Sequence, residues 1–369
     1  MAISLARKNL FAEKTRLLIS VGGVAFSVLL ILVLLSLYQG WQTLIASYVN
    51  GVKADVWVMQ EGTVDMFHSV TLIPITFREN LKEMDGVGEV DRLLMRRVSI
   101  ELGGKDVDLQ LIGYDTVSGR GGPSRVVSGS DSPGRGEIIL DRVFTNSNSL
   151  KLNDEIVVSG RNFKIVGISE GGNFIVTQTG FIPIEDAEEL LEMQIFANYF
   201  LVSVKEGFGA EGVIQTIEAN SDLDARGRAE FLEDNQGLVT ETFLPIIEVL
   251  VLIGFAVGVA IVGLTVYTAT IEKSREYGIL KAIGAGNTYL YQTIFEQSLI
   301  SSLLGFAVGV ALTYAVDSAA GALVPEFVTV IRPVDIALVL GVAVLMSIFA
   351  SFIPIKRIAG LDPMLVFKS

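Results

Sequence analysis

Four long apolar stretches dominate the hydrophobic pattern of this chain. They run over residues 17–38, 243–271, 294–316 and 333–355. The acids within them, Glu248, Glu296 and Asp335, lie near the ends of their stretches, where a carboxylate can reach the membrane interface at modest cost. An α-helix needs about 20 apolar residues to cross a hydrocarbon core of about 30 Å. The pattern therefore predicts four transmembrane helices. The first stretch is too long for a signal-peptide core and no clear cleavage site follows it, so we expect an uncleaved anchor.

The polar region between the first two stretches has a mixed pattern. Short alternating runs predict strands at 54–59, 97–102, 107–112, 155–159, 163–168, 174–177, 180–184 and 199–204. Two pairs of these runs flank glycine-containing turns at 103–105 and 160–162 and predict hairpins. Helices are expected at about 76–84, 185–194 and 209–219. The mixture indicates one α+β domain of one or two lobes.

The segment Ser118–Gly136 interrupts this pattern, because 13 of its 19 residues are Gly, Ser or Pro. Such a composition predicts a mobile surface loop or a joint between lobes.

Composition supports a membrane protein. Of 369 residues, 50% are hydrophobic and only 19% are charged, against about 25% charged in soluble domains. The chain has no cysteine, which excludes disulfides, thiolate metal sites and cysteine nucleophiles. It has a single histidine, His68, which leaves little room for histidine chemistry.

The distribution of charge predicts the orientation. Ten Lys and Arg residues flank the spans at the N-terminus, in the loop after the second span and at the C-terminus, against four acids there; the bases are Arg7, Lys8, Lys14, Arg16, Lys273, Arg275, Lys281, Lys356, Arg357 and Lys368. The region 39–243 instead holds 17 basic and 32 acidic residues. Basic loops stay in the cytoplasm, so we expect both termini inside, the large domain outside, and no nucleic-acid partner.

The resulting fold class is an α-helical membrane protein with four transmembrane helices plus an α+β extracytoplasmic domain between helices 1 and 2. The predicted parts are an amphipathic segment at 1–16, spans at 17–38, 243–271, 294–316 and 333–355, the external domain at 39–242, a cytoplasmic helix and loop at 272–293, an external loop at 317–332 and a cytoplasmic tail at 356–369.

We find no enzyme site in this pattern. A serine hydrolase would need His68, which lies in an apolar-polar mixture typical of a loop. The acids at Glu185, Asp186, Glu188 and Glu189 lack an EF-hand spacing and fit the first turn of a helix, so no metal site is expected. No G-x-x-x-x-G-K-[ST] motif occurs, and any nucleotide chemistry must come from a separate polypeptide.

The segment 272–287 is charged at its start and amphipathic afterwards. Ile279, Ala282 and Ile283 fall on one helical face, and Gly284 and Gly286 can end the helix. Such a helix suits the groove of another protein as well as it suits lipid headgroups, and the pattern alone leaves both alternatives open.

This segment resembles the "ExxREIGxLRAxGA" signature of MacB-like ABC transporter permeases, a group that includes macrolide exporters, lipoprotein-releasing permeases and the cell-division permease FtsX. The matching residues are Glu272, Arg275, Glu276, Gly278, Ile279, Leu280, Lys281, Ala282, Gly284 and Ala285. Tyr277 and Lys281 replace the usual Ile and Arg. Glu296 and the ending around Asp362 and Pro363 also resemble the family, as do the runs that begin at 136, 150 and 163 in the external domain.

The resemblance implies a permease subunit in the bacterial inner membrane. The signature helix would contact a dimer of cytosolic ATPase subunits that bind ATP and Mg²⁺, while this chain binds no cofactor. ATP-driven movement would pass to the external domain along the first two spans, with Arg228–Thr242 available to continue the second span outward. The resemblance also implies three further partners: a second permease copy, which can be identical or different, membrane lipid, and a periplasmic adaptor.

Two G-x-x-x-G pairs lie in the second and third spans, at Gly254 with Gly258 and at Gly305 with Gly309. Such pairs let helices approach closely. We expect either packing of these two spans on each other or a homodimer seam, for which Gly254 and Gly258 are the better candidates.

Three functions remain open at this point: export or extraction of a substrate, FtsX-like activation of cell-wall hydrolases, and a membrane-anchored binding module without an ATPase. The large external domain favours the first.

Overall fold

The computed structural model describes residues 6–7, 10, 12–66, 71–172, 177–323 and 327–359. It divides into a helical unit, formed by Met1–Gln39 and Phe243–Ser369, and a sheet domain, Gly40–Thr242. His68, Asp362, Pro363 and most of the strand expected at 174–177 lie outside the described residues, as does part of the N-terminal segment.

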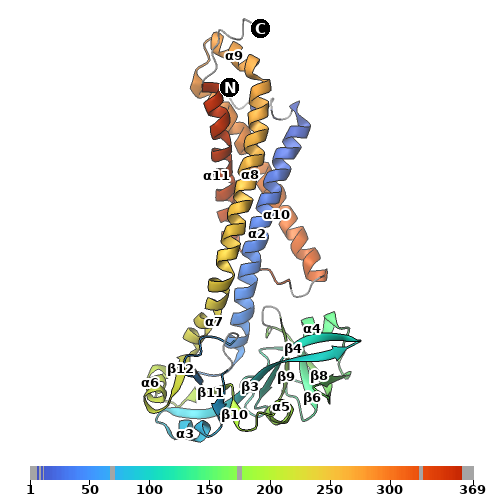
Figure 1. Ribbon diagram of the computed structural model, residues 1–369, viewed down its shortest axis with the longest axis vertical. Coiled ribbons are helices and arrows are strands. Elements are labelled where there is room, and N and C mark those ends of the chain that lie inside the picture. The colour runs from blue at the N-terminus through green and yellow to red at the C-terminus, as the bar shows by residue number, and fades with distance from the viewer. Residues whose placement is uncertain are drawn as a thin grey trace. The chain divides into compact units, whose positions relative to one another are not determined.

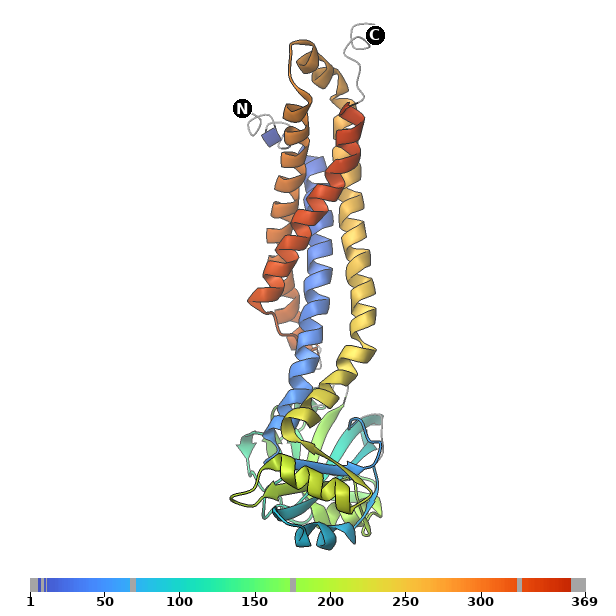
Figure 2. The same cartoon turned by 90° about the vertical axis from the view of Figure 1, so that its left-hand side faces the viewer.

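The helical unit contains four long helices that lie side by side (Figures 1 and 2). They are α2 (Lys14–Gly51), whose first part belongs to this unit, α8 (Leu244–Glu272), α10 (Asn287–Leu323) and α11 (Pro333–Ala359). All four are long and apolar enough to cross a membrane. Two of these helices are much longer than their apolar stretches, because polar residues continue α2 to Gly51 and α10 in both directions.

Two prolines of this unit lie at helix starts. Pro333 opens α11 and Pro245 lies in the first turn of α8, where a proline leaves no backbone hydrogen bond unmade. Arg332 holds the start of α11 through two hydrogen bonds of 2.9 and 2.8 Å to the Asp335 carboxylate.

The sheet domain is a mixed sheet in the order β12-β1-β11-β3-β4-β9-β6-β8-β5, with β7 added on β8. The strands are β1 (Val56–Gln60), β3 (Val87–Leu102), β4 (Lys105–Tyr114), β5 (Val126–Gly129), β6 (Glu137–Asp141), β7 (Glu155–Val158), β8 (Arg161–Ser169), β9 (Gln178–Pro183), β11 (Tyr199–Val204) and β12 (Leu223–Gly227); β2 (Ile73–Pro74) and β10 (Phe196–Ala197) form a separate pair. The helices are α3 (Phe77–Glu83), α4 (Arg142–Ser147), α5 (Ile184–Leu191), α6 (Ala210–Asn220) and α7 (Arg228–Thr242).

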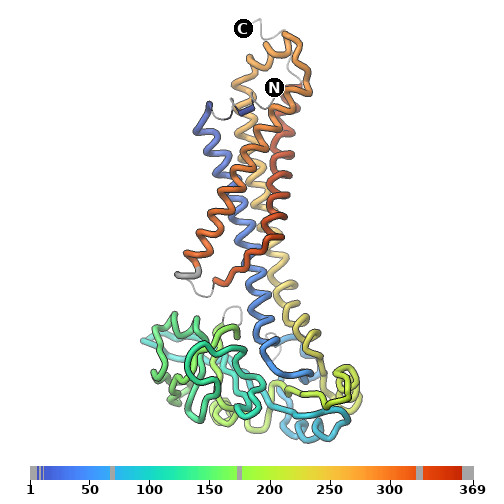
Figure 3. The backbone as a smooth tube through the Cα atoms, turned by 180° about the vertical axis from the view of Figure 1, so that it is seen from behind, coloured from blue at the N-terminus to red at the C-terminus, as the bar shows by residue number. Residues whose placement is uncertain are grey.

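One strand, β3, joins two lobes of this domain (Figure 3). Its residues up to Leu93 pair with β11, and its residues from Leu94 onward pair with β4. Each lobe has its own apolar core. The core of the β11 lobe centres on Val90, Phe200 and Ile217, and that of the β4 lobe on Leu111 and Phe163; all five side chains are fully buried.

An aromatic cluster forms a third core where the end of α2 and α7 meet the sheet. Trp57 of β1 stacks on Phe231 of α7 with ring centroids 4.4 Å apart, and Tyr199 lies edge-on at 5.8 Å from each ring. Tyr48 of α2 packs on Trp57 at 6.5 Å, and its hydroxyl donates to the Gly121 carbonyl at 3.1 Å. The end of α2 and α7 are thus fixed to the sheet by large buried rings.

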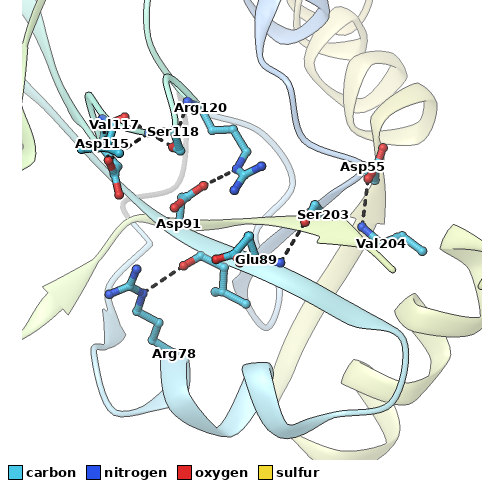
Figure 4. Close-up of polar contacts among 11 residues, drawn as sticks. Asp55, Arg78, Glu89, Asp91, Asp115, Val117, Ser118, Arg120, Ser203 and Val204 are labelled. Atoms are coloured by element: carbon cyan, nitrogen blue, oxygen red, sulfur yellow. Dashed lines mark hydrogen bonds and ion pairs between the residues drawn. The ribbon is translucent and has the colours of Figure 1, made fainter. Parts of the chain in front are cut away.

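The segment that follows β4 packs against the lobe of β1, β3 and β11, as Figure 4 shows. Arg120 pairs with the buried Asp91 carboxylate on β3. Asp115 accepts hydrogen bonds from the backbone of Val117 and Ser118, at 2.8 and 3.2 Å, and shapes the preceding turn. Gly121, at a φ of +86°, lies where a Cβ would meet the Leu93 side chain at 2.6 Å.

The α+β prediction is confirmed, with both predicted hairpins present as β3–β4 and β7–β8. The expectation of a loop throughout Ser118–Gly136 is wrong in part. Val126–Gly129 forms β5 and pairs with β8, and Arg120 is held as described above. The lobes are joined by β3 rather than by this segment.

Candidate functional site

The candidate coupling helix is α9 (Ser274–Ala282), between α8 and α10. Its end is fixed by two backbone hydrogen bonds, from Ala285 to the Leu280 carbonyl at 2.9 Å and from Gly284 to the Lys281 carbonyl at 3.0 Å. This pair of bonds is a Schellman motif. It requires a left-handed residue after the helix, and Gly284 has a φ of +100°. Gly284 and Ala285 therefore define where the helix stops.

One face of α9 packs on the helical unit. Tyr277 is 2% exposed and belongs to the core cluster that contains Leu290, Ile294 and Ile358. Gly278 is buried beside it, and Leu280 packs against the same cluster. These contacts explain why an aromatic residue is tolerated at the usual Ile position of the signature: here it fills a core.

Two charged signature residues have partners within the chain. Both oxygens of the Glu272 carboxylate accept from Arg16 of α2 at 2.9 Å. Lys281 donates from Nζ to the Ile358 carbonyl at 2.8 Å and to the Ala359 carbonyl at 3.4 Å, at the end of α11.

The opposite face of α9 is exposed. Ile279 is 45% and Ile283 is 76% exposed, and Arg275, Glu276 and Ala282 are exposed with them. Within the described residues, neither Arg275 nor Glu276 takes part in an ion pair. The face therefore combines an apolar stripe with one unpaired cation and one unpaired carboxylate. These groups can contact a partner by apolar burial and by charge-assisted hydrogen bonds.

The four glycines of the G-x-x-x-G pairs face α2 and α11, not each other. A Cβ at Gly305 would meet Val24 at 2.5 Å, and one at Gly309 would meet Val28 at 2.7 Å. A Cβ at Gly254 would lie 3.4 Å from Ile31 of α2. A Cβ at Gly258 would meet Met346 of α11 at 2.7 Å and Ser27 of α2 at 3.0 Å. The expected packing of the second and third spans on each other through these glycines is corrected: the first helix is the common neighbour.

Glu296 lies on α10 and is half-buried. Its Oε2 is buried, with no hydrogen-bond partner in the described part of the chain. The structure does not bring it into the face of α9.

The acidic group at the start of α5 is used in ion pairs. Asp186 is fully buried and bonds Arg161 at 2.8 Å and the Gly136 amide at 2.7 Å. Glu189 bonds Arg161 at 3.0 Å and also pairs with Arg135. The hydrogen bond from Arg135, and the charges of both arginines, hold the pKa of Glu189 below its ordinary value. These acids fasten the turn before β6 onto α5.

The sequence pattern missed Arg16 and the end of α11 as parts of this site. Arg16 lies 256 positions from Glu272, and Ile358 lies 77 positions from Lys281. A helical period relates residues three or four apart, so it carries no signal for such distant pairs.

Comparisons with known proteins place the chain in a family. The MacB-like periplasmic core domain matches residues 17–220, and the FtsX-like permease C-terminal domain matches residues 248–363. An uncharacterized ABC transporter permease of Methanocaldococcus jannaschii is 24% identical over 98% of this chain and 96% of its own length. A probable export ATP-binding/permease protein of Pseudomonas fluorescens is 22% identical over 98% of this chain, which spans 59% of that protein.

Among solved structures, the periplasmic region of MacB from Actinobacillus actinomycetemcomitans matches 50% of this chain and 94% of its own, with 10% identity and a TM-score of 0.40. A likeness at this level says nothing about function. The family assignment depends instead on the two sequence matches, of which the first covers more than half of the chain. The chain belongs to the family of ABC transporter permeases with a MacB-like core domain and an FtsX-like C-terminal part.

Proposed function

We propose that this chain is the transmembrane subunit of an ABC system in a bacterial inner membrane. Its α9 helix would dock on a separate ATPase subunit. That partner would hold the ATP and Mg²⁺, and its turnover would move the sheet domain outside the membrane to export or extract a substrate. The basic residues that flank α8, α10 and α11 near α9 favour a cytoplasmic position for this helix and for both termini.

The exposed face of α9 is the observation that carries the proposal. Its inner face is packed and its stop is fixed by Gly284, so the helix presents Arg275, Glu276, Ile279 and Ile283 in a defined arrangement. Because the helix is already held in place, little conformational entropy is lost when a partner binds, and this favours affinity. Charged residues beside the apolar stripe supply register and specificity.

The assembly that we propose contains two copies of this chain and two ATPase subunits. The second copy can be identical or related. Lipid surrounds the helical unit, and a periplasmic adaptor is a further candidate partner for the sheet domain. The family relationship supports these partners, and α9 supplies the contact for the ATPase.

Photocross-linking from α9 tests the proposal. A benzophenone side chain placed at position 279 or 283, in cells that make this chain with its own operon, should capture a protein that carries the G-x-x-x-x-G-K-[ST] motif. Position 334 is a matched control, because Val334 is 69% exposed at the other end of α11. The purified complex should hydrolyse ATP, and this chain alone should not. Failure of both α9 positions to capture a nucleotide-binding protein would contradict the proposal.

A further inference from the structure

Two polar contacts link α9 and the residue that ends α8 to helices that do not adjoin α9 in the chain: Lys281 of α9 contacts α11, and Glu272 of α8 contacts α2. Backbone connections link α9 only to α8, through Lys273, and to α10, through residues 283–286. The contacts from Arg16 to Glu272 and from Lys281 to the end of α11 add the other two long helices. α8, α10 and α11 are therefore joined to α9 by a covalent link or a hydrogen bond, and α2 is hydrogen-bonded to the last residue of α8, two positions before α9 begins.

The first contact lies in a small network of alternating charges. Arg16 bonds Glu272 and also pairs with Glu13, and the Lys273 Nζ lies 3.9 Å from Glu13. The Glu272 side chain is 61% exposed, and an exposed pair of this kind adds little to the stability of a fold. Its main consequence is geometric: it connects the end of α8, two residues before α9 begins, to α2, which continues as one helix to Gly51.

The second contact satisfies the end of a helix. The last carbonyl groups of an α-helix have no partner within it, and a cation there is favoured by the helix dipole. Lys281 meets both needs at Ile358 and Ala359, the last described residues of α11. Arginine has the reach and the charge to do the same, whereas methionine has neither the charge nor a hydrogen-bond donor.

We propose that Glu272, at the α8–α9 junction, and Lys281, on α9, are positioning residues that pass displacement of this junction and of α9 to α2 and α11, and are not contacts for the ATPase. This inference depends on the proposed function, because it divides the signature into an outward docking face and two inward ties. Without these ties, α2 and α11 would follow α9 only through lateral packing in the bundle.

Cysteine pairs test the geometry without any partner, since the chain contains no cysteine. In membranes that hold the full chain, Arg16→Cys with Glu272→Cys, and Lys281→Cys with Ala359→Cys, should form cross-links with a short bifunctional thiol reagent. Arg16→Cys with Arg275→Cys is the control, because Arg275 is exposed on the outward face, and it should link far less. Equal linking in the control pair would overturn the proposed ties.

Substitutions in the ATPase-bound complex test the role. The Lys281→Met and Glu272→Gln variants should co-purify with as much ATPase as the unsubstituted chain, but lose more than half of the ATP-dependent change in hydrogen exchange of the sheet domain. The Lys281→Arg variant should retain that change, and Arg16→Glu combined with Glu272→Arg should recover part of what Glu272→Gln loses.

The outcomes separate this inference from the proposed function. If Lys281→Met and Glu272→Gln reduce the amount of bound ATPase, the two residues are docking contacts and the inference is wrong while the proposed function stands. If the variants keep the full response to ATP, the inference is also wrong. If cross-linkers at 279 and 283 capture no ATPase, the proposed function itself fails, whatever the cysteine pairs show.

Discussion

Trp57 of β1 and Phe231 of α7 stack with ring centroids 4.4 Å apart and an interplanar angle of 21°. They join the first strand of the sheet domain to the helix that precedes the second membrane helix. Both rings are fully buried. Movement of α7 is therefore expected to reach the sheet through this stack instead of being absorbed by local rearrangement.

Truncation of Phe231 should loosen this junction. We expect Phe231→Ala to destabilise the sheet domain by about 3–5 kcal/mol, the usual cost of removing a buried aromatic ring. Hydrogen exchange of β1 and α7 in the full-length chain measures this effect. Phe208→Ala is the control, because Phe208 is 54% exposed, and it should cost less than about 1 kcal/mol. Equal protection of β1 in both variants would show that the stack does not anchor α7.

Close packing of α10 on α2 gives a second prediction. Gly305→Ala should destabilise the helical unit although alanine is the better helix former, because its Cβ would meet Val24 at 2.5 Å and the Val21 carbonyl at 3.0 Å. Overpacking of this kind costs about 1–3 kcal/mol. The melting temperature of the protein in detergent should fall. Gly341→Ala has no atom within 4 Å of its new Cβ and should leave the melting temperature unchanged or slightly raised.

The stop of α9 gives a third prediction. Gly284→Ala places a side chain at a φ of +100°, which costs about 1–2 kcal/mol and disfavours the Schellman motif. If docking needs the preformed stop, binding of the ATPase should weaken by a factor of about 5–30. Gly286→Ala, two residues on, has open space around the new Cβ and no left-handed φ. A binding assay that finds the two variants equally weak would argue against a role for the stop.

Prediction from sequence succeeded where a local signal existed. The β3–β4 and β7–β8 hairpins were predicted because Gly103, Gly104 and Gly160 mark turns between alternating runs, and all three have positive φ. The first half of β3 was missed because residues 90–94 are all buried, so no alternation marks them. β6 was missed for the same reason, since four of its five residues are buried.

The candidate site was predicted as a helix but not as a divided surface. The helical period placed Ile279, Ala282 and Ile283 on one face, and the structure leaves that face exposed. A period cannot say which face packs inward, because that depends on neighbours distant in the chain. Glu272 contacts Arg16, and Lys281 contacts the end of α11; both contacts became apparent only in three dimensions.

Low pH should weaken the ion pairs of Glu189 that hold the turn before β6 on α5. The pKa of Glu189 is lowered, first by the hydrogen bond from Arg135 and then by the charges of Arg135 and Arg161. A carboxyl whose pKa is lower in the folded state than in the unfolded state stabilises the fold at pH values above its ordinary pKa, which is 4.5 here. This stabilisation is lost as the pH falls through the lowered pKa of the folded state. At neutral pH the contribution is fully present.

Glu189→Gln should therefore lower the melting temperature of the full-length chain at about pH 7. The difference from the unsubstituted chain should shrink at an acidic pH below the lowered pKa of Glu189, where both side chains are uncharged. Added salt should shrink it as well, because Arg135 and Glu189 are exposed and their attraction is screened. Glu61→Gln is the control: Glu61 is exposed and takes part in no ion pair within the described residues, so its effect should be small at either pH. A difference for Glu189→Gln that stays constant between the two pH values would mean that the carboxylate acts through its packing and not through its charge.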